Sequence, residues 1–326
     1  MKKLKVASFF CGCGGSDLGI LGDFTFLDKY YPELPFEIIY ALDIDKFAVQ
    51  TYNYNFKHQA VCDDVRDIDI ENIEPFDVLL GGFPCQSFST VNPTKNTNDE
   101  RANLYKELVR ILKNKQPKFF ICENVKGLMT LQKGEILKKV IREFYEVGYD
   151  VSYQLLLGAN YGIPQKRERV FIIGVRKDLG LKYEFPITTH SQKGDNGKKK
   201  WVALKSVIQN LVIEEKKYYF SEKAVQGMKN AKNNMKRGVW QDLNEPCLTI
   251  TSHLSKTSLN SRDPVLLVDP VKELYRRFTP REAANIQSFP MNFKFPVIDV
   301  QAYKQIGNAI PPVLMWYIAS ELSKIV

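Results

Sequence analysis

The chain has 326 residues, of which 44% are hydrophobic and 25% are charged, and its formal net charge is +9. This length predicts one large domain with a smaller one attached, and the composition excludes a disordered or fibrous protein. The longest apolar runs are of strand length and the N-terminus lacks the apolar stretch of a signal peptide, so we expect a cytoplasmic protein whose positive charge favours a polyanionic partner.

Apolar strand-like runs alternate with amphipathic stretches over the first 175 residues. Leu104–Lys115 and Glu135–Val147 have helical patterns, and Val313–Ile325 is expected to be a terminal helix that rejoins the sheet. The alternation predicts an α/β fold with a doubly wound, mostly parallel sheet, whose ligands bind at the carboxyl ends of the strands. The predicted strands are Leu4–Phe10, Glu37–Asp43, Phe76–Leu80, Lys118–Cys122 and Val170–Val175.

A glycine-rich turn, Cys11–Ser16 with the sequence CGCGGS, follows the first predicted strand. Glycines at such a turn let the backbone approach a ligand, although similar sequences also form plain tight turns. The next strand ends at Asp43, and Asp45 follows two residues later. A carboxylate at this distance can bind ribose hydroxyls or cap a helix. Together the two features predict a cofactor that contains adenosine, without indicating which one.

Cys85 lies in the segment Gly81–Ser89, directly after the third predicted strand. A cysteine in a loop at a strand end, with glycines and a proline around it, is suitably placed for a nucleophile. A lone cysteine is more often an inert small hydrophobe. The six cysteines are scattered and form no C-x-x-C pair, so we expect reduced thiols and no metal site.

The fourth predicted strand is followed by Glu123, Asn124 and Val125, which brings an acid to the same edge of the sheet as the thiol. Arg167 and Arg169 precede the fifth strand and supply guanidinium groups. Two arginines near a strand start are usually surface ion pairs. Beside a glutamate and a cysteine, they are suited to anchoring a polar ring.

The middle of the chain differs in composition from both ends. Ser191–Lys200 is polar and basic with two glycines, which indicates a linker and a domain boundary. Between Leu181 and Lys272 there are 16 Lys and Arg against 9 Asp and Glu, an excess of 7 that accounts for most of the net charge. Gln226–Arg237 is basic and rich in Asn, as suits loops that contact a phosphate backbone, although a solvated basic face is the alternative.

These motifs together resemble those of the DNA cytosine-5 methyltransferases, especially the bacterial restriction-modification enzymes. The resemblance spans almost the whole chain except its middle. It implies that residues 1–190 and 300–326 form a catalytic domain of the Rossmann-like methyltransferase class, and that residues 191–299 form a target-recognition domain with a hinge at about 273–299. The motifs are Gly12/Gly14/Gly15, Pro84-Cys85-Gln86, Glu123-Asn124-Val125, Gln165-x-Arg167-x-Arg169, Arg277–Pro290 with Thr279-Pro280-Arg281-Glu282, and Gly307-Asn308-Ala309.

The resemblance implies a covalent mechanism. Carbon 5 of cytosine is a poor nucleophile, so the Cys85 thiolate would add to carbon 6 and activate it. Glu123 would hydrogen-bond or protonate ring nitrogen 3. Arg169 would hold the carbonyl oxygen of the base and orient Glu123, and Arg167 would support the loop or a phosphate. The implied catalytic residues are Cys85, Glu123, Arg167, Arg169, Pro84 and Asn124.

The implied cofactor is S-adenosyl-L-methionine. Phe10 would stack on its adenine, Asp43 would bind its ribose, and Asn308 would close the pocket. Phe10 could instead be a core residue, and Asp64 could be one of several solvated acids. The implied cofactor-binding residues are Phe10, Gly12, Gly14, Gly15, Asp43, Ile44, Asp64, Val65 and Asn308.

The implied substrate is double-stranded DNA, from which the target base must be flipped out before a side chain can reach it. Ser87 and the loop Val91–Arg101 are candidates for closing over the base. Asn244–Ile250 resembles the recognition segment of the family, with Thr249 in the characteristic position. The expected DNA-binding residues are Ser87, Arg237, Thr249, Lys256 and Arg262, and Lys232 and Lys236 are further candidates.

Three other functions compete with this interpretation. A nicotinamide-dependent oxidoreductase would use the glycine turn and Asp43, but leaves Cys85 and Glu123 without a role. A DNA-binding protein that has lost catalysis conflicts with the intact nucleophile and acid. A tRNA cytosine-5 methyltransferase of the same family would carry out the same reaction on transfer RNA instead of DNA. We expect a monomer without membrane contact, associated with the nucleoid, and a cognate restriction endonuclease that acts on the same site.

Overall fold

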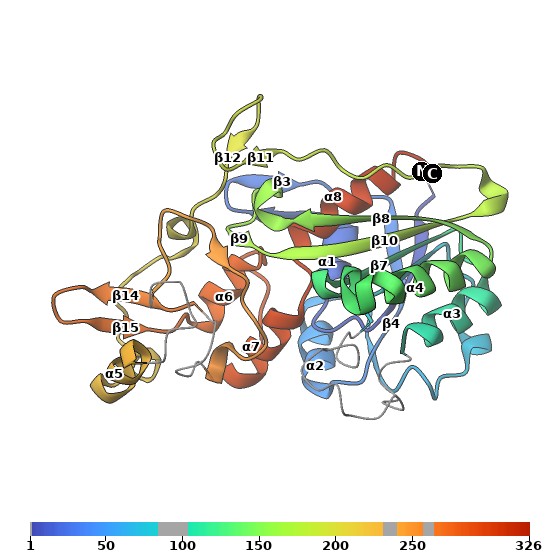
Figure 1. Cartoon of the computed structure of the whole chain (residues 1–326). Coiled ribbons are helices and arrows are strands. Elements are labelled where there is room, and N and C mark those ends of the chain that lie inside the picture. Colours follow the sequence, from blue (N-terminus) through green and yellow to red (C-terminus); the bar gives the residue numbers. More distant parts are fainter. Residues whose placement is uncertain (1, 84–103, 231–239, 257–263) are drawn as a thin grey trace.

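The computed structural model describes residues 2–83, 104–230, 240–256 and 264–326. Its centre is a seven-stranded sheet with the strand order β5-β4-β1-β6-β7-β10-β8 (Figure 1). All of these strands are parallel except β10, which runs antiparallel to both of its neighbours. The predicted fold class is therefore confirmed. The strands are β1 Leu4–Phe9, β4 Phe36–Asp43, β5 Val61–Cys62, β6 Val78–Gly81, β7 Phe119–Val125, β8 Tyr149–Leu157 and β10 Glu168–Arg176.

Helices cover both faces of this sheet because successive strand side chains point to opposite sides. In β1, Val6 packs on the side of α1 (Gly15–Leu21) and α8 (Pro312–Leu322), while Ala7 packs on the side of α3 and α4. Figure 1 shows α3 and α4 together on one face. The helix α8 packs against α1, so the C-terminus returns to the first layer as predicted. The remaining helices of the layers are α2 Lys46–Asn55, α3 Leu104–Lys115 and α4 Glu135–Glu146.

The antiparallel strand β10 changes what lies at the carboxyl edge of the sheet. Its first residues pair with the last residues of β7, with Arg169 opposite Val125. The strand begins at Glu168, earlier than the predicted start at Val170. An antiparallel strand delivers its N-terminal end to the edge where its parallel neighbours end. Arg169 therefore lies beside Glu123 because of the direction of β10.

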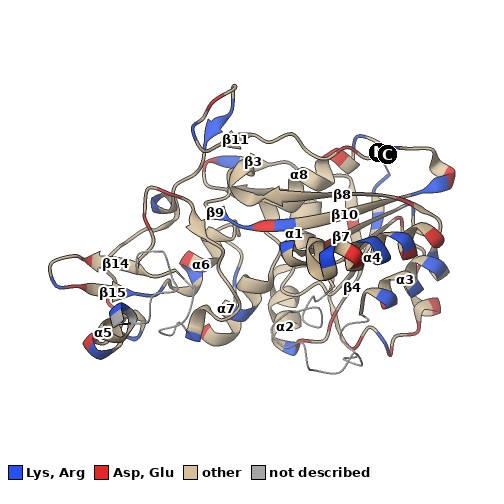
Figure 2. Ribbon diagram, in the orientation of Figure 1, with Lys and Arg blue, Asp and Glu red and all other residues tan. Residues whose placement is uncertain are grey.

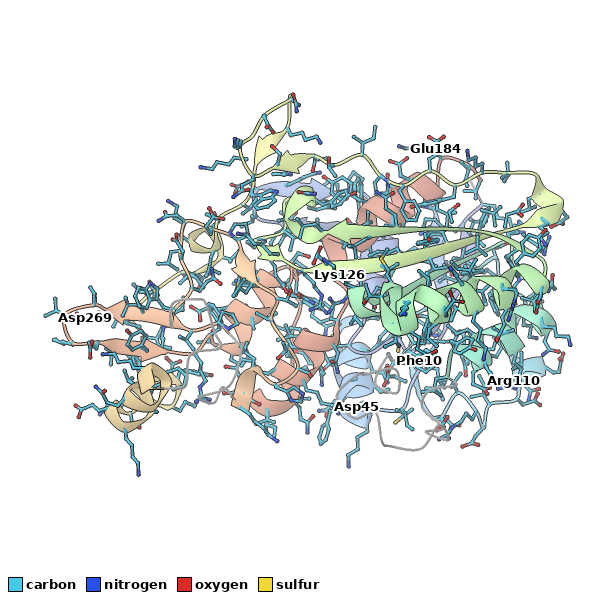
Figure 3. The ribbon with its side chains drawn as sticks, viewed as in Figure 1. Phe10, Asp45, Arg110, Lys126, Glu184 and Asp269 are labelled. Atoms are coloured by element: carbon cyan, nitrogen blue, oxygen red, sulfur yellow. The ribbon has the colours of Figure 1, made fainter. Side chains whose placement is uncertain are left out.

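The second half of the chain forms short elements that project away from the sheet. Figure 1 shows α5 and the β14–β15 hairpin as the outermost part, and Figure 3 shows Asp269 at the hairpin tip, far from Phe10. Figure 2 shows Lys and Arg mixed with Asp and Glu on α5. The remaining strands and α-helices of the described chain, of which β2 and β3 belong to its first half, are β2 Phe24–Phe26, β3 Lys29–Tyr31, β9 Gln165–Lys166, β11 His190–Ser191, β12 Lys199–Lys200, α5 Glu222–Asn230, β13 Cys247–Leu248, β14 Leu266–Asp269, β15 Leu274–Arg276, α6 Pro280–Ile286 and α7 Asp299–Asn308.

Helix α6 follows the β14–β15 hairpin in the chain. Thr279 caps it, and Glu282 closes a capping box with the Thr279 backbone. Both oxygens of Glu282 also accept hydrogen bonds of 2.7 Å from the buried Arg276 guanidinium. This bidentate pair joins β15 to α6. No helix in the described ranges is long and apolar enough to cross a membrane.

Candidate active site

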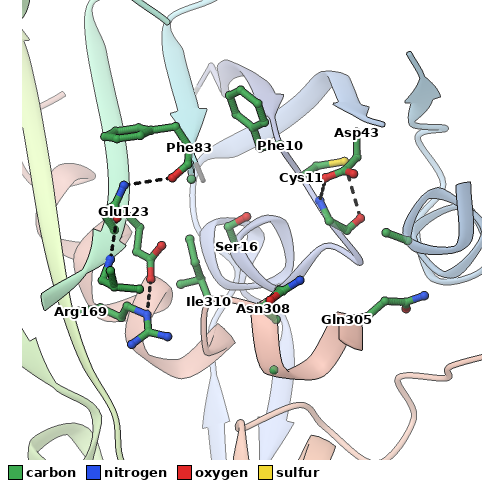
Figure 4. A pocket seen from close by; sticks show the side chains of 18 of the residues that line it. Phe10, Cys11, Ser16, Asp43, Phe83, Glu123, Arg169, Gln305, Asn308 and Ile310 are labelled. Atoms are coloured by element: carbon green, nitrogen blue, oxygen red, sulfur yellow. Dashed lines mark hydrogen bonds and ion pairs between the residues drawn. The ribbon is translucent and has the colours of Figure 1, made fainter. Parts of the chain in front are cut away.

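A cavity of about 700 Å³ lies at the carboxyl edge of the sheet. Its walls come from the glycine turn after β1 and from the ends of β4, β6 and β7. The start of β10, the segment Thr130–Gln132 and the C-terminal end of α7 complete them. Figure 4 shows Glu123 and Arg169 on one side of this pocket, with Asp43 and Gln305 toward the other. One continuous cavity therefore joins the acid and arginine to six of the nine predicted cofactor residues.

The glycine turn is held in place by Asp43. One carboxylate oxygen of Asp43 accepts a hydrogen bond of 2.8 Å from the backbone N–H of Gly12, and the other accepts one of 2.8 Å from Asp45 N–H. Burial raises the pKa of Asp43, and these two hydrogen bonds oppose that rise. Gly12 has φ +56° and Phe10 has φ +58°, so the turn uses left-handed backbone on both sides of Cys11.

Close packing explains two of the glycines. A side chain at Gly15 would put a Cβ atom 2.4 Å from the carbonyl oxygen of Ile310, and one at Gly14 would come within 2.2 Å of the Phe56 ring. Gly15 lines the cavity, whereas Gly14 packs behind it. The turn thus brings the backbone to the cavity on one side and to the chain's C-terminal segment on the other.

The sequence did not decide whether Asp43 or Asp45 caps the next helix, and the structure shows that Asp45 caps α2. Its side chain accepts hydrogen bonds from Phe47 and Ala48 N–H at the start of α2, and it forms an ion pair of 2.6 Å with Lys304. Ile44, between the two acids, is 66% exposed and lines the cavity. Asp43 and Asp45 both line the cavity, but only Asp45 caps α2 and pairs with Lys304.

Besides Gly14, two predicted cofactor residues, Asp64 and Val65, lie outside the lining of this cavity. The carboxylate of Asp64 pairs with the Arg66 guanidinium at 2.6 Å. The Val65 side chain is buried, and its carbonyl accepts a hydrogen bond from Arg110. Neither residue is among those that line the pocket. Their assignment remains a prediction from the resemblance alone.

Glu123 and Arg169 form a nearly buried ion pair. The distance from Glu123 Oε1 to Arg169 Nε is 2.8 Å, and the two side chains are 11% and 12% exposed. Burial raises the pKa of Glu123, although Arg169 and Arg167 both act to lower it. A carboxyl group with a raised pKa, held by a guanidinium at the wall of a cavity, can deliver a proton or a hydrogen bond to a polar ring.

Asn124 holds Phe83, the last described residue before the segment that carries Cys85. Its side-chain amide donates a hydrogen bond of 3.0 Å to the carbonyl of Phe83, and its oxygen accepts one from Val125 N–H. Asn124 is 3% exposed and Phe83 is also 3% exposed, so this connection is buried. Asn124 therefore anchors Phe83 to the end of β7.

Arg167 is a buried connector between distant parts of the chain. Its guanidinium donates hydrogen bonds to the carbonyls of Ile250, Gly307 and Ala309, and its side chain is 1% exposed. Ile250 ends the predicted recognition segment, and the other two carbonyls lie at the end of α7. Arg167 thus links these segments of the chain, and its assignment as a catalytic residue stays a prediction. Thr249 makes a similar link, because its hydroxyl donates to the carbonyl of Lys166.

We predict that Arg167→Met lowers the free energy of unfolding by about 2–4 kcal/mol, because three buried carbonyls lose their donor. Urea unfolding of both proteins measures this difference. Arg142→Met is the matched control, since Arg142 is 70% exposed and its ion pair with Glu146 is 3.8 Å long. We expect this control to change stability by less than about 0.5 kcal/mol. Equal stability of Arg167→Met and the wild type would contradict the connector role.

Below the glycine turn, Asp17 is fully buried and accepts hydrogen bonds from the hydroxyls of Ser8, Ser16 and Tyr52. Burial raises the pKa of Asp17 to about 6, and the hydroxyl donors only partly offset that rise. The folded protein therefore holds the proton of Asp17 more tightly than the unfolded chain. Its contribution to stability is complete below its ordinary pKa and is lost as the pH rises through about 6.

This pKa predicts a pH-dependent effect of Asp17→Asn. Between about pH 4.5 and about pH 7.5, the stability of the variant relative to the wild type should rise by about 2 kcal/mol. Chemical unfolding of both proteins at several pH values measures this difference. The other acids titrate alike in the two proteins, so their contributions cancel when the stabilities are subtracted. If the difference in stability is constant over this range, the raised pKa of Asp17 is wrong.

Several predicted residues lie outside the described ranges: Pro84, Cys85, Ser87, Arg237 and Arg262, with Lys232, Lys236 and the loop Val91–Arg101. Lys256 is exposed, and Thr249 is partly buried against β9. Sequence reasoning missed cavity residues that include Ser16, Lys304 and Gln305. The spacing of Gln305, three residues before Asn308 on a helix, is the signal that could have indicated it.

Comparison with known proteins gives consistent matches over nearly the whole chain. The model of the family described as C-5 cytosine-specific DNA methylase matches residues 4–324. The Type II methyltransferase M.FnuDI of Fusobacterium nucleatum is 33% identical, over 98% of this chain and 94% of that protein. The Type II methyltransferase M.BsuRI of Bacillus subtilis is 34% identical, over 98% of this chain and 79% of that protein.

Solved structures support the fold. The Dnmt2 methyltransferase of Schizosaccharomyces pombe superposes with a TM-score of 0.74 at 19% identity, over 99% of this chain and 98% of that chain. The Entamoeba histolytica methyltransferase EhMeth superposes with a TM-score of 0.73 at 20% identity, with the same coverage. At these identities the likeness is one of fold.

Proposed function

This chain belongs to the C-5 cytosine-specific DNA methylase family, and from this membership we propose how its residues transfer a methyl group to carbon 5 of a cytosine in DNA. The enzyme is a DNA (cytosine-5-)-methyltransferase. The observation that carries the proposed mechanism is the buried pair of Glu123 and Arg169, in one cavity with the glycine turn. We propose that it is the modification enzyme of a restriction-modification system.

The cavity fits S-adenosyl-L-methionine by size and lining. Its volume of about 700 Å³ lies within the range of about 300–1,000 Å³ of small-molecule sites. Phe10 and Ile44 supply apolar surface for a purine, Asp43 supplies a carboxylate for ribose hydroxyls, and Asn308 closes the far side. Gly12 leaves open space where a side chain would stand. When bound, this cofactor supplies an electrophilic methyl group.

The proposed chemistry begins with the Cys85 thiolate, whose sulfur forms a bond to carbon 6 of the flipped cytosine. Glu123 protonates or hydrogen-bonds nitrogen 3, which accepts the electron density displaced by this attack. Arg169 holds Glu123 and is suitably placed for the carbonyl oxygen of the base. Carbon 5, now electron-rich, would take the methyl group that the cofactor supplies, and the methyl–sulfur bond would break to leave S-adenosylhomocysteine. Loss of the carbon 5 proton then allows the carbon–sulfur bond to break and frees Cys85.

The raised pKa of Glu123 supports this role. Burial favours the neutral carboxyl, which is the form that can donate a proton to nitrogen 3. Arg169 and Arg167 limit the rise, so the group can also give the proton up. Asn124 contributes by fixing Phe83, the residue two positions before Cys85. The acid and the loop that carries the nucleophile are thus tied to the same strand.

The reaction is tested by incubating the protein with S-adenosyl-L-methionine labelled in its methyl group. Duplex DNA, tRNA and a nicotinamide cofactor are supplied in separate reactions. We expect label in the DNA, as 5-methylcytosine at one sequence. Label in tRNA alone would show that the substrate is tRNA and not DNA. Turnover of the nicotinamide without methyl transfer would reject the methyltransferase function.

We also propose that residues 191–299, with a hinge at about 273–299, select the DNA sequence, while residues 1–190 and 300–326 carry the chemistry. Exchange of Lys198–Lys272 for the corresponding segment of a relative should move the sequence preference with it. Sequencing of methylated sites in DNA from cells that express the hybrid measures this. If the preference stays with the remainder of the chain, the division into domains is wrong.

For partners, we propose that the enzyme acts as a monomer on double-stranded DNA in the cytoplasm, associated with the nucleoid. A cognate restriction endonuclease would act on the same sequence without needing to bind this chain. Lys256 is exposed near the recognition segment and is suited to a phosphate contact. Thr249 is suited to positioning that segment through its hydrogen bond to Lys166.

A further inference from the structure

Asp17 is a buried carboxylate that has no cationic partner in the described part of the chain. It is 0% exposed and accepts hydrogen bonds of 2.9 Å from the hydroxyls of Ser8, Ser16 and Tyr52. These three donors are neutral, and no described lysine, arginine or histidine forms an ion pair with the carboxylate. The charge of Asp17 is therefore hydrogen-bonded but is not neutralised by an opposite charge.

An unneutralised charge in the interior is unusual. Moving a carboxylate out of water is costly, and buried charges in proteins are normally paired with an opposite charge. Burial raises the pKa of Asp17 to about 6, because the three hydroxyls only partly offset this cost. At about pH 8 the group is ionised all the same. A positive charge that arrives nearby is therefore stabilised by an anion that the rest of the protein leaves uncompensated.

Asp17 lies directly behind the wall of the cavity. Ser16, whose hydroxyl donates to the Asp17 carboxylate, lines this cavity. Figure 4 shows Ser16 between the side of Glu123 and the side of Asp43. The sulfur that carries the methyl group must lie in this middle part, because the ribose is proposed at Asp43 and the target base at Glu123. The buried anion is thus placed behind the position of the reacting sulfur.

We propose that Asp17 favours the methyl donor over its spent product by charge alone, without touching either ligand. This inference rests on the proposed function. S-adenosyl-L-methionine carries a positive charge on its sulfur, whereas the sulfur of S-adenosylhomocysteine is neutral and the rest of the two ligands is alike. Transfer of the methyl group leaves the electron pair of the broken bond on sulfur. The attraction to Asp17 is then lost, which favours exchange of the product for new donor.

Asp17→Asn removes the charge and keeps the shape of the side chain. At about pH 8, its Kd for S-adenosyl-L-methionine should rise by about 10-fold, as expected when one charge pair is lost at an effective dielectric constant of about 20. Sinefungin, which has an ammonium group in place of the sulfonium, should bind more weakly by a similar factor. The Kd for S-adenosylhomocysteine should change by less than about 2-fold. Calorimetric titration of the three ligands measures these constants.

Asp23→Asn is the matched control, because it removes the same charge just beyond the other end of α1. Asp23 is exposed, and its carboxylate accepts a hydrogen bond of 2.8 Å from the Tyr30 hydroxyl. Solvent screens a charge at this position, so all three Kd values should stay within about 2-fold of the wild type. Equal weakening of the three ligands by Asp17→Asn would show that Asp17 only supports the shape of the cavity. That result, or unchanged binding of all three, would overturn the proposal.

A pH series is also informative, since few other groups near Asp17 titrate between about pH 5 and about pH 8. Burial raises the pKa of Tyr52, Cys11 and Cys13, so these groups stay neutral over this range. The buried side chains of α8, which packs on α1, are all apolar. Asp43 also has a raised pKa and lines the cavity, but its carboxylate is held by backbone N–H groups and not by Tyr52.

Tyr52→Phe uses this difference to test the charge without replacing Asp17. In the wild type, the preference for S-adenosyl-L-methionine over S-adenosylhomocysteine should fall as the pH drops through about 6 and Asp17 takes up a proton. Loss of the Tyr52 donor raises the pKa of Asp17 further, so the fall should move to higher pH. A pH profile that Tyr52→Phe leaves in place would contradict the role of Asp17. Failure of the wild type to bind S-adenosyl-L-methionine at any pH would instead reject the proposed function itself.

Discussion

Cys85→Ser is expected to abolish methyl transfer while DNA binding stays largely intact. A serine hydroxyl is far less nucleophilic than a thiolate, so carbon 6 is not attacked and carbon 5 is not activated. We expect kcat to fall by at least about 10³-fold. Transfer of labelled methyl groups and a gel-shift assay with the same duplex measure the two properties.

Cys62→Ser is the control for this variant. Cys62 is exposed at the end of β5, outside the cavity lining, and its thiol donates a weak hydrogen bond to the Ile44 carbonyl at 3.8 Å. The control should keep its activity within about 2-fold of the wild type. Retained turnover in Cys85→Ser would reject the covalent mechanism.

Glu123→Gln has the second largest expected effect. Glutamine keeps the size of the side chain but cannot deliver a proton to nitrogen 3, so kcat should fall by about 10²- to 10⁴-fold. Because burial raises the pKa of Glu123 and the protonated form is the active one, wild-type activity should decline as the pH rises above that pKa. The residual activity of Glu123→Gln should lack this decline. Single-turnover rates across a pH series measure both effects.

Glu168→Gln is the matched control on the neighbouring strand. Glu168 is 40% exposed and pairs with Lys126 at 3.0 Å on the surface. We expect its rate and its pH profile to match those of the wild type. If Glu123→Gln turns over as fast as this control, Glu123 does not act on the base.

Much of the central sheet and of the helices that cover it could be predicted from the sequence, because these elements are long and periodic. The predicted helix Leu104–Lys115 has the bounds observed for α3, and the predicted strands correspond to β1, β4, β6, β7 and β10 within a few residues. Hydrophobic periodicity identifies such elements with no knowledge of their neighbours. The strand β8, Tyr149–Leu157, was not predicted, since polar residues interrupt its pattern.

The contacts within the site could be predicted less well, because they depend on residues far apart in the chain. The direction of β10 places Arg169 beside Glu123, and no local pattern indicates an antiparallel strand. Arg167 bonds carbonyls 83 to 142 positions away, so its role as a connector could be stated only as an alternative. The burial of Asp17 among hydroxyls from β1, α1 and α2 is visible only in the folded structure.

The central claim is that the sulfur of Cys85 bonds transiently to the pyrimidine ring. An oligonucleotide with 5-fluorocytosine at the target position tests it, since fluorine blocks the loss of a proton from carbon 5 and holds the adduct. We predict a complex that survives denaturing electrophoresis, requires S-adenosyl-L-methionine and is absent with Cys85→Ser. A preparation that methylates ordinary DNA but never becomes attached to this oligonucleotide would contradict the mechanism.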